Sequence, residues 1–271
     1  MSDQDEPKVS VGFVNCNRLH YLKSCVESFL ESTKDYKNKE IIVVDNASVE
    51  EGTSEYLDDL QSRGFSVYRR EKRDPSNEFA LALNTIVEKA TGEYLIPLQS
   101  DMQFVVKGKW LSEYVRFAKA YEGNVGAITL DAQRKVTHSG NQLSNFASVD
   151  GGNLPFLVDF SRPPSSGAAD CFYPMSVINK IYPWETKNSE HEGSDDSETK
   201  MLKKIASITQ AQGLEWRIVH PMVPVAIAIY TDARGTNARV RGNKRYGDYW
   251  PPKKDYRYYE MFDFETLLSE K

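Results

Sequence analysis

The first half of the chain alternates between short apolar runs and amphipathic segments, and this alternation strongly limits the folds that it can adopt. A short apolar run between turn residues is typical of a buried strand, and apolar residues at helical spacing between such runs predict helices. Strands that alternate with helices form a parallel sheet with helices on both faces. We therefore expect an α/β fold. The predicted strands are residues 9–14, 40–45, 65–68, 94–98 and 125–130.

The second half is less regular. Residues 146–170 are rich in Gly, Pro, Ser and Asn, which favours loops, and residues 185–198 are strongly acidic. No repeat or clear linker divides the 271 residues, a length that one domain can reach. We expect a single domain over residues 1–271. Its predicted parts are an ordered half of about 8–130, an irregular half of about 131–233 and a basic, aromatic extension over 234–271.

Composition excludes several classes of protein. The net charge of −5 provides no basic field for nucleic acid. Three scattered cysteines, Cys16, Cys25 and Cys171, suit neither a disulfide framework nor a cysteine-rich zinc site. The acidic N-terminus is unlike a signal peptide, and no apolar run approaches the roughly 20 residues that span a bilayer. The expected location is the cytoplasm, without an integral membrane segment and with peripheral membrane contact left open.

Two of the predicted strands lead into acidic residues. Asp45 ends one strand, and Asp101 follows another in Gln99-Ser100-Asp101. In a parallel sheet both would face one crevice at the carboxyl ends of the strands, where ligands bind. Asp45 suits a hydrogen bond from a base or ribose, and Asp101 suits a divalent metal on a diphosphate. The alternative is that each Asp caps a following helix; for two such residues we favour the ligand role.

Other patterns carry weaker indications. Gly-x-Gly-x-x-Gly and the Gly-Lys-Ser/Thr phosphate loop are both absent from the sequence. The acidic stretch 193–198 contains a candidate general base, but taken alone it favours a solvated helix start. The charged run 69–74 is typical of a solvated loop, and none of the four histidines has zinc-site spacing.

Taken together, several segments resemble the inverting family 2 glycosyltransferases, which have the GT-A fold. Residues 90–101, Ala-Thr-Gly-Glu-Tyr-Leu-Ile-Pro-Leu-Gln-Ser-Asp, form the most specific match. Asn46 after Asp45, and residues 136–140, are similar to the rhamnosyltransferase-like branch. The resemblance covers about residues 9–138 and resumes more weakly around 168–221.

The resemblance implies roles for individual residues. Asp101 would hold Mg²⁺ or Mn²⁺, and Asp196 would be the catalytic base, with Asp195 as the neighbouring candidate. The late metal-binding His of many relatives has no counterpart after Pro221, so Asp232 and His220 are the candidates for its place. The implied donor-binding residues are Asn15, Asn17, Arg18, Asp45, Asn46, Asn84, Gln99 and Ser100.

The sequence therefore predicts transfer of a sugar from a nucleoside-diphosphate sugar to a hydroxyl of a glycan or a lipid-linked acceptor. UDP is the expected nucleotide, with dTDP left open. The basic stretch 234–259 would either fold over the donor phosphates or pack on the surface. One alternative is a catalytically silent relative that binds a sugar nucleotide or glycan. Another, a nucleotidyltransferase, needs a Gly-rich basic loop that residues 15–20 do not supply.

Overall fold

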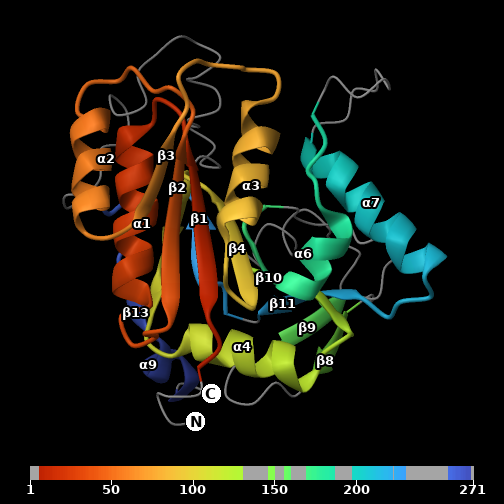
Figure 1. Ribbon diagram of the computed structural model, residues 1–271. Coiled ribbons are helices and arrows are strands. Elements are labelled where there is room, and N and C mark those ends of the chain that lie inside the picture. The colour runs from red at the N-terminus through yellow and green to blue at the C-terminus, as the bar shows by residue number, and fades with distance from the viewer. Residues whose placement is uncertain are drawn as a thin grey trace.

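The computed structural model describes residues 6–130, 146–149, 156–159, 169–186, 197–221, 223–229 and 256–269. Strands and helices alternate through the first of these ranges, as the sequence pattern predicts (Figure 1). The elements are β1 (Val9–Asn15), α1 (Leu19–Ser32), β2 (Lys39–Asp45), α2 (Thr53–Ser62), β3 (Ser66–Arg69), α3 (Glu78–Lys89), β4 (Tyr94–Gln99), β5 (Met102–Phe104), β6 (Val106–Lys107), α4 (Trp110–Ala120) and β7 (Val125–Thr129).

The later ranges add short strands and three helices. They complete the far side of the sheet and return the chain to α1 and β6. These elements are β8 (Phe146–Val149), β9 (Phe156–Asp159), β10 (Cys171–Pro174), α6 (Met175–Ile181), α7 (Ser197–Ala211), β11 (Arg217–Pro221), β12 (Ala226–Ala228), β13 (Phe262–Asp263) and α9 (Phe264–Ser269).

One nine-stranded sheet in the order β3-β2-β1-β4-β10-β7-β11-β9-β8 forms the centre of the molecule. The strands β3, β2, β1 and β4 are parallel neighbours, as expected for strands joined by helical crossovers. β10 enters between β4 and β7 and is antiparallel to both, and β9 is antiparallel to β11. The sheet is therefore mostly parallel, and the α/β fold expected from the sequence is confirmed.

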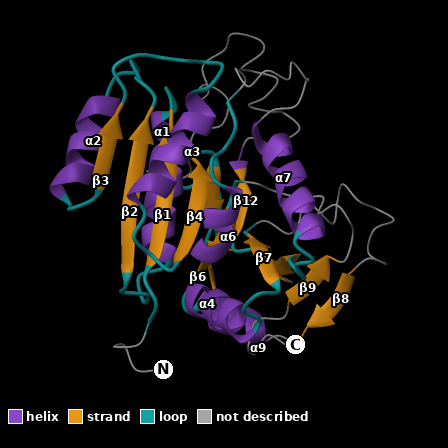
Figure 2. Cartoon of the chain, turned by 45° about the vertical axis from the view of Figure 1, so that its right-hand side comes forward, coloured by secondary structure: helices purple, strands orange, loops and turns teal. Residues whose placement is uncertain are grey.

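Helices cover both faces of this sheet (Figure 2). Val11 and Phe13 of β1 pack in the cluster that contains the apolar side chains of α1, α2 and α4. Val14 packs in the opposite cluster, with α3, α6 and α7. Because successive side chains of a strand point to opposite faces, a strand buried on both sides must be apolar throughout. This requirement explains the apolar runs 11–14 in β1, 41–44 in β2 and 94–98 in β4.

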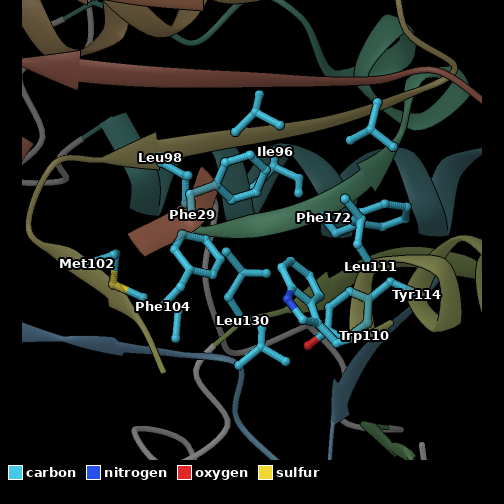
Figure 3. Packing of buried hydrophobic residues seen from close by; sticks show 14 of the residues in the cluster. Phe29, Ile96, Leu98, Met102, Phe104, Trp110, Leu111, Tyr114, Leu130 and Phe172 are labelled. Carbon is cyan, nitrogen blue, oxygen red and sulfur yellow. The ribbon is translucent and has the colours of Figure 1, made fainter. Parts of the chain in front are cut away.

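Aromatic side chains dominate the core on the α1 and α4 side. The rings of Phe29 and Phe104 lie edge to face at 5.1 Å between centroids, and Trp110 stacks on Phe104 at 5.7 Å (Figure 3). The buried indole of Trp110 donates its Nε1–H to Ser32 Oγ at 2.7 Å. A buried Trp is favourable when its N–H finds such an acceptor. These contacts join α4 to α1 beneath the sheet.

Gly12 brings α3 close to the opposite face of β1. A Cβ at this position would lie 2.2 Å from Cγ2 and 2.7 Å from Cδ1 of Ile86 on α3. Real Cβ atoms do not approach other carbons so closely, so any larger residue would push the helix outward. The absence of a side chain at Gly12 thus sets the height of α3 above the sheet. The first residues of α3, Glu78 and Phe79, reach the carboxyl edge of the sheet.

The C-terminal residues are anchored on the first half of the chain. Gln103 Oε1 accepts the backbone N–H groups of Tyr258 and Tyr259, at 2.7 and 2.9 Å, and its Nε2 donates to Tyr259 O. The ring of Tyr258 packs on Tyr21 of α1, and β13 pairs with β6. The part of 234–259 that is described, 256–259, therefore contacts α1 and β5. None of the described helices is long and apolar enough to cross a bilayer.

Candidate functional site

The register of the parallel strands brings the predicted site residues to one edge. Asn15 lies opposite Asp45, and Val14 lies opposite Gln99, so β1, β2 and β4 end side by side. A cavity of about 420 Å³ opens at this edge. Of the predicted donor-binding residues, those that line it are Asn15, Asn17, Arg18, Asn46, Gln99 and Ser100.

Asp45 lies just behind the cavity wall, where it is 3 % exposed. Its Oδ1 accepts hydrogen bonds from Asn15 Nδ2 at 2.8 Å and Ser48 Oγ at 2.6 Å, and its Oδ2 accepts the Ser48 N–H at 2.9 Å. These bonds form a tight loop after β2, in which Ala47 has a φ of 51°. Because α2 begins after Gly52 and has no side-chain cap, Asp45 does not cap this helix. It instead fixes the loop that carries Asn46.

Asn17 joins the loop after β1 to the loop after β2. Its Oδ1 accepts the backbone N–H groups of Val49 and Glu50, at 2.7 and 3.2 Å, and its own N–H donates to Ser48 Oγ at 2.8 Å. Its φ of 48° lies in the left-handed region, which Asn adopts more readily than most residues. The family-like Asn-Arg turn therefore has a structural basis, since Asn17 holds the turn and Arg18 is presented to the cavity.

Asp101 lies between β4 and β5, with its side chain 5 % exposed. Arg18 Nη1 lies 3.2 Å from its Oδ2. The backbone of Asp101 is held as well, because its carbonyl accepts the N–H of Ile229 at 2.8 Å. The residue is followed by strand β5, so the helix-capping alternative does not apply to it. The buried Asp101 carboxylate is therefore paired with a guanidinium that lines the cavity.

Gln99 connects β4 to the second half of the chain. Its backbone N–H donates to Asp170 Oδ1 at 2.9 Å, and its Nε2 donates to Glu198 Oε2 at 3.4 Å. Glu198, in the first turn of α7, also accepts the Ala169 N–H at 3.3 Å. A neutral amide at position 99 can donate to Glu198, whereas a carboxylate there would repel it. The Gln in place of a first Asp therefore has a clear structural consequence.

Several residues that line the cavity were not predicted from the sequence, among them Arg73 and Cys16. Arg73 belongs to the charged run interpreted as a solvated loop, yet it lines the cavity and binds Glu78 through two bonds, Nε–Oε2 at 2.7 Å and Nη2–Oε1 at 2.6 Å. Cys16 lines the same wall. Burial, reinforced by the Glu78 carboxylate, raises the pKa of the Cys16 thiol to about 11. The Arg73–Glu78 spacing was visible in the sequence, but only the turn between β3 and α3 brings it to the cavity.

Asp170 was also missed, because it follows a loop-rich stretch. It has a φ of 57°, and its backbone N–H donates to Pro97 O at 2.8 Å. Burial raises the pKa of the Cys25 thiol strongly, and Asp170 and Asp101 add to this effect. The carboxyl edge of β4 is therefore a locally negative region. An acid directly before the apolar residues of β10 was the only signal in the sequence.

Two other predicted site residues have well-defined places. Asn84 on α3 donates from Nδ2 to Trp184 O at 2.9 Å and accepts the Trp184 N–H at 2.7 Å, and it does not line the cavity. These bonds hold α3 against the segment after α6. The role of Asn84 in donor binding stays a prediction. His220 is buried in β11 beside Thr129, with 2.8 Å between Nδ1 and Oγ1.

Several predictions fall outside the described residues. These include Asp195 and Asp196, residues 136–140, Asp232 and the tail cations between 234 and 255. Glu198, two residues after Asp196, is the described acidic residue of that stretch, and it accepts a hydrogen bond from Gln99.

The described residues fit a divalent cation only in one way. They contain no cluster of three or more His, Cys, Asp or Glu side chains that could hold a metal ion. They do provide the buried carboxylate of Asp101, which does not itself line the cavity but follows Ser100 and contacts Arg18, two residues that do. Mg²⁺ and its analogues commonly bind through one or two carboxylates, with substrate phosphates and water as the other ligands. Asp101 therefore fits a cation that arrives with a diphosphate.

Similar proteins share the fold. The mannosyltransferase PcManGT of Pyrobaculum calidifontis, solved with GDP-Man and Mn²⁺, superposes with a TM-score of 0.60 at 18 % identity over 89 % of this chain and 62 % of that one. S. aureus TarS 1–349 with UDP-GlcNAc gives 0.53 at 16 % identity, over 79 % and 55 %. GalNAc-T7 with UDP, GalNAc and Mn²⁺ gives 0.53 at 15 %, over 82 % and 43 %. The chain thus spans less than two thirds of each of these structures.

Sequence comparison adds the family. An uncharacterized protein, y4gI, of Sinorhizobium fredii is 34 % identical over 135 residues, which are 49 % of this chain and 14 % of that protein. The sequence model described as glycosyl transferase family 2 matches residues 10–179, which is more than half of the chain. The match includes β1, β2, β4 and the residues around the cavity. The chain therefore belongs to glycosyl transferase family 2.

Proposed function

We propose that this protein is an inverting glycosyltransferase that moves a sugar from a nucleoside-diphosphate sugar to a hydroxyl group of a glycan or lipid-linked acceptor. The observation that carries the proposal is the convergence of Asn15, Arg18, Asn46 and Gln99 on one cavity, where Arg18 also contacts the buried Asp101. Membership of family 2 and the GT-A neighbours, which were solved with GDP-Man, UDP-GlcNAc or UDP, support the same reaction class. The rhamnosyltransferase-like branch remains part of the proposal.

The proposed reaction assigns a task to each group. Asn15 and Asn46 hold the nucleotide, within loops that Asp45 fixes. Arg18 binds the diphosphate, since guanidinium pairs well with phosphate oxygens. Asp101 holds Mn²⁺ or Mg²⁺, which neutralises charge on the leaving diphosphate when bound. Asp196 takes the proton of the acceptor hydroxyl, whose oxygen attacks the anomeric carbon on the face opposite the leaving group.

A thermal-shift panel of UDP-, GDP- and dTDP-sugars, each with and without Mn²⁺, tests donor binding. A ligand at about 100 times its Kd stabilises the native state by about 2.7 kcal/mol, which raises the Tm of a domain of this size by about 5 °C. We expect one nucleotide to give this shift and Mn²⁺ to enlarge it. No shift with any of the donors would contradict the proposal.

The Asp196→Asn variant tests the base. Transfer by this variant should fall at least about a hundredfold, while its thermal shift with the donor stays that of the wild type. Asp195→Asn is the matched neighbour and should retain more activity. Wild-type turnover by Asp196→Asn would remove this residue from the mechanism.

The second candidate is a catalytically silent relative that binds a sugar nucleotide or glycan. The observation that favours it is Gln99, whose side chain is engaged by Glu198 at the place of a first metal-binding Asp. A donor-induced thermal shift without hydrolysis or transfer of any donor would support it.

A further inference from the structure

Arg18 and Asp101 form an ion pair whose two side chains differ in their exposure to solvent. The Asp101 carboxylate is 5 % exposed, whereas the Arg18 side chain is 35 % exposed and lines the cavity. The acid is fixed at the turn from β4 to β5, where Ile229 N–H binds its carbonyl. The arginine precedes α1 on a long, flexible side chain. One partner is therefore held in place, and the other can reach either the carboxylate or a group that enters the cavity.

A buried carboxylate needs a nearby positive charge, because desolvation otherwise makes its ionised form costly. In this part of the fold the charges around Asp101 are mainly negative, since Asp170 and Glu198 both contact Gln99, two residues away. Arg73 is engaged by Glu78. Arg18, in contrast, contacts the Asp101 carboxylate directly.

We propose that Arg18 is the counter-ion of Asp101 while the cavity holds no donor, and that it makes divalent-cation binding at Asp101 conditional on a diphosphate. Arg18 Nη1 lies at 3.2 Å from Oδ2, so a cation at that oxygen must compete with the guanidinium. A diphosphate in the cavity offers Arg18 a second anionic partner and releases the carboxylate. This inference rests on the proposed function for the identity of the diphosphate, but the pair itself is independent of transfer activity.

Binding of the cation and binding of the diphosphate are thermodynamically coupled through Arg18 in this proposal. If the diphosphate favours the cation by drawing Arg18 away, the cation favours the diphosphate by the same factor. Removing the guanidinium should raise the affinity of the donor-free protein for the cation, and it should shrink the coupling between cation and diphosphate. A coupling in the usual range changes affinity by about 5- to 150-fold.

The experiment measures Mn²⁺ alone against the full chain without nucleotide, by the decrease in the electron paramagnetic resonance signal of free aqueous Mn²⁺. We expect Arg18→Gln to bind Mn²⁺ at least about tenfold more tightly than the wild type. Arg18→Met should behave in the same way. The double variant Arg18→Gln/Asp101→Asn should lose the gain. Arg63→Gln is the control, because it breaks a surface ion pair with Glu27 elsewhere in the fold.

The same titrations with UDP or GDP present, corrected for Mn²⁺ bound by nucleotide alone, measure the coupling. Circular dichroism confirms that each variant is folded. The proposal is overturned if neither Arg18 variant binds Mn²⁺ more tightly than the wild type, or if the gain survives in the double variant. A gain at Asp101 in a protein without transferase activity would uphold the counter-ion role and refute the proposed function. Transfer activity without that gain in Mn²⁺ affinity would uphold the proposed function and refute the counter-ion role.

Discussion

Replacing Asp45 by Ala and by Asn separates the loss of hydrogen-bond acceptors from the loss of charge. The Ala variant removes the acceptor from the Ser48 N–H and leaves Asn15 Nδ2 with the longer bond of 3.2 Å to Ser48 Oγ. A buried donor without an acceptor costs about 1–3 kcal/mol. A third donor, the Ser48 hydroxyl, also loses Asp45 as its acceptor but can rotate toward another. The other two donors, in a site where Asp45 is 3 % exposed, give an expected loss of about 2–5 kcal/mol in the free energy of unfolding.

The Asn variant should cost less, about 1 kcal/mol. Its side-chain oxygen can still accept the Ser48 N–H, and its amide nitrogen can donate to Ser48 Oγ. The Asn15 amide can turn to present its oxygen instead of its nitrogen. What remains lost is mainly the strengthening that an ionised acceptor gives to a hydrogen bond.

Urea unfolding followed by tryptophan fluorescence measures these differences. Asp58→Ala is the matched control: Asp58 pairs with Arg69, but its side chain is 67 % exposed, so the change should stay within about 0.5 kcal/mol. Equal losses for the Ala and Asn variants would refute the argument from unpaired donors. A loss below about 1 kcal/mol for Ala would show that the loop after β2 does not depend on Asp45.

Two further predictions concern the framework of the site. Gly12→Ala should lower the free energy of unfolding by about 1–3 kcal/mol, because the added Cβ clashes with Ile86. In an Ile86→Ala background the same change should cost clearly less. A double-mutant cycle by urea unfolding measures this, and additive losses would argue against the close approach. Burial raises the pKa of Glu40, but hydrogen bonds from Lys8 and Thr91, among others, outweigh this and lower it from 4.5 to about 2. The stability that Glu40 contributes is present above about pH 4.5 and is lost as the pH falls toward 2. Glu40→Gln should therefore flatten the dependence of the free energy of unfolding on pH across that window. An unchanged pH dependence would contradict this.

The sequence predicted the parallel part of the fold well, because burial on both faces leaves a signal in every residue of a strand. β1, β2 and β4 were recognised from their mainly apolar residues, and their carboxyl ends indicated where Asp45 and Asp101 would lie. The short strands β8 to β11 were not predicted. Their partners are distant in the chain, as with β10 between β4 and β7, and their few residues carry little local pattern.

The candidate site, like the fold, was predictable from the sequence only in part. Asn17 was recognised from its motif, but its task of tying two loops together depends on contacts to Val49 and Glu50. Arg73 looked like part of a solvated run, and only the turn into α3 brings it to the cavity with Glu78. Asp170 lies 71 or more residues away from every part of β4 and β1 along the chain, yet its carboxylate accepts the Gln99 N–H.

By itself, the sequence determined the parallel part of the sheet, the edge at which the cavity opens and the acids near that edge. These follow from strand periodicity and from the common direction of parallel strands, which are local properties. Only the tertiary structure decided which charges meet. Arg18 and Asp101 are 83 positions apart, and Gln99 and Glu198 are 99 apart. Pairing between such residues depends on how helices and loops pack over the sheet, and that packing is set by the whole core rather than by any one segment.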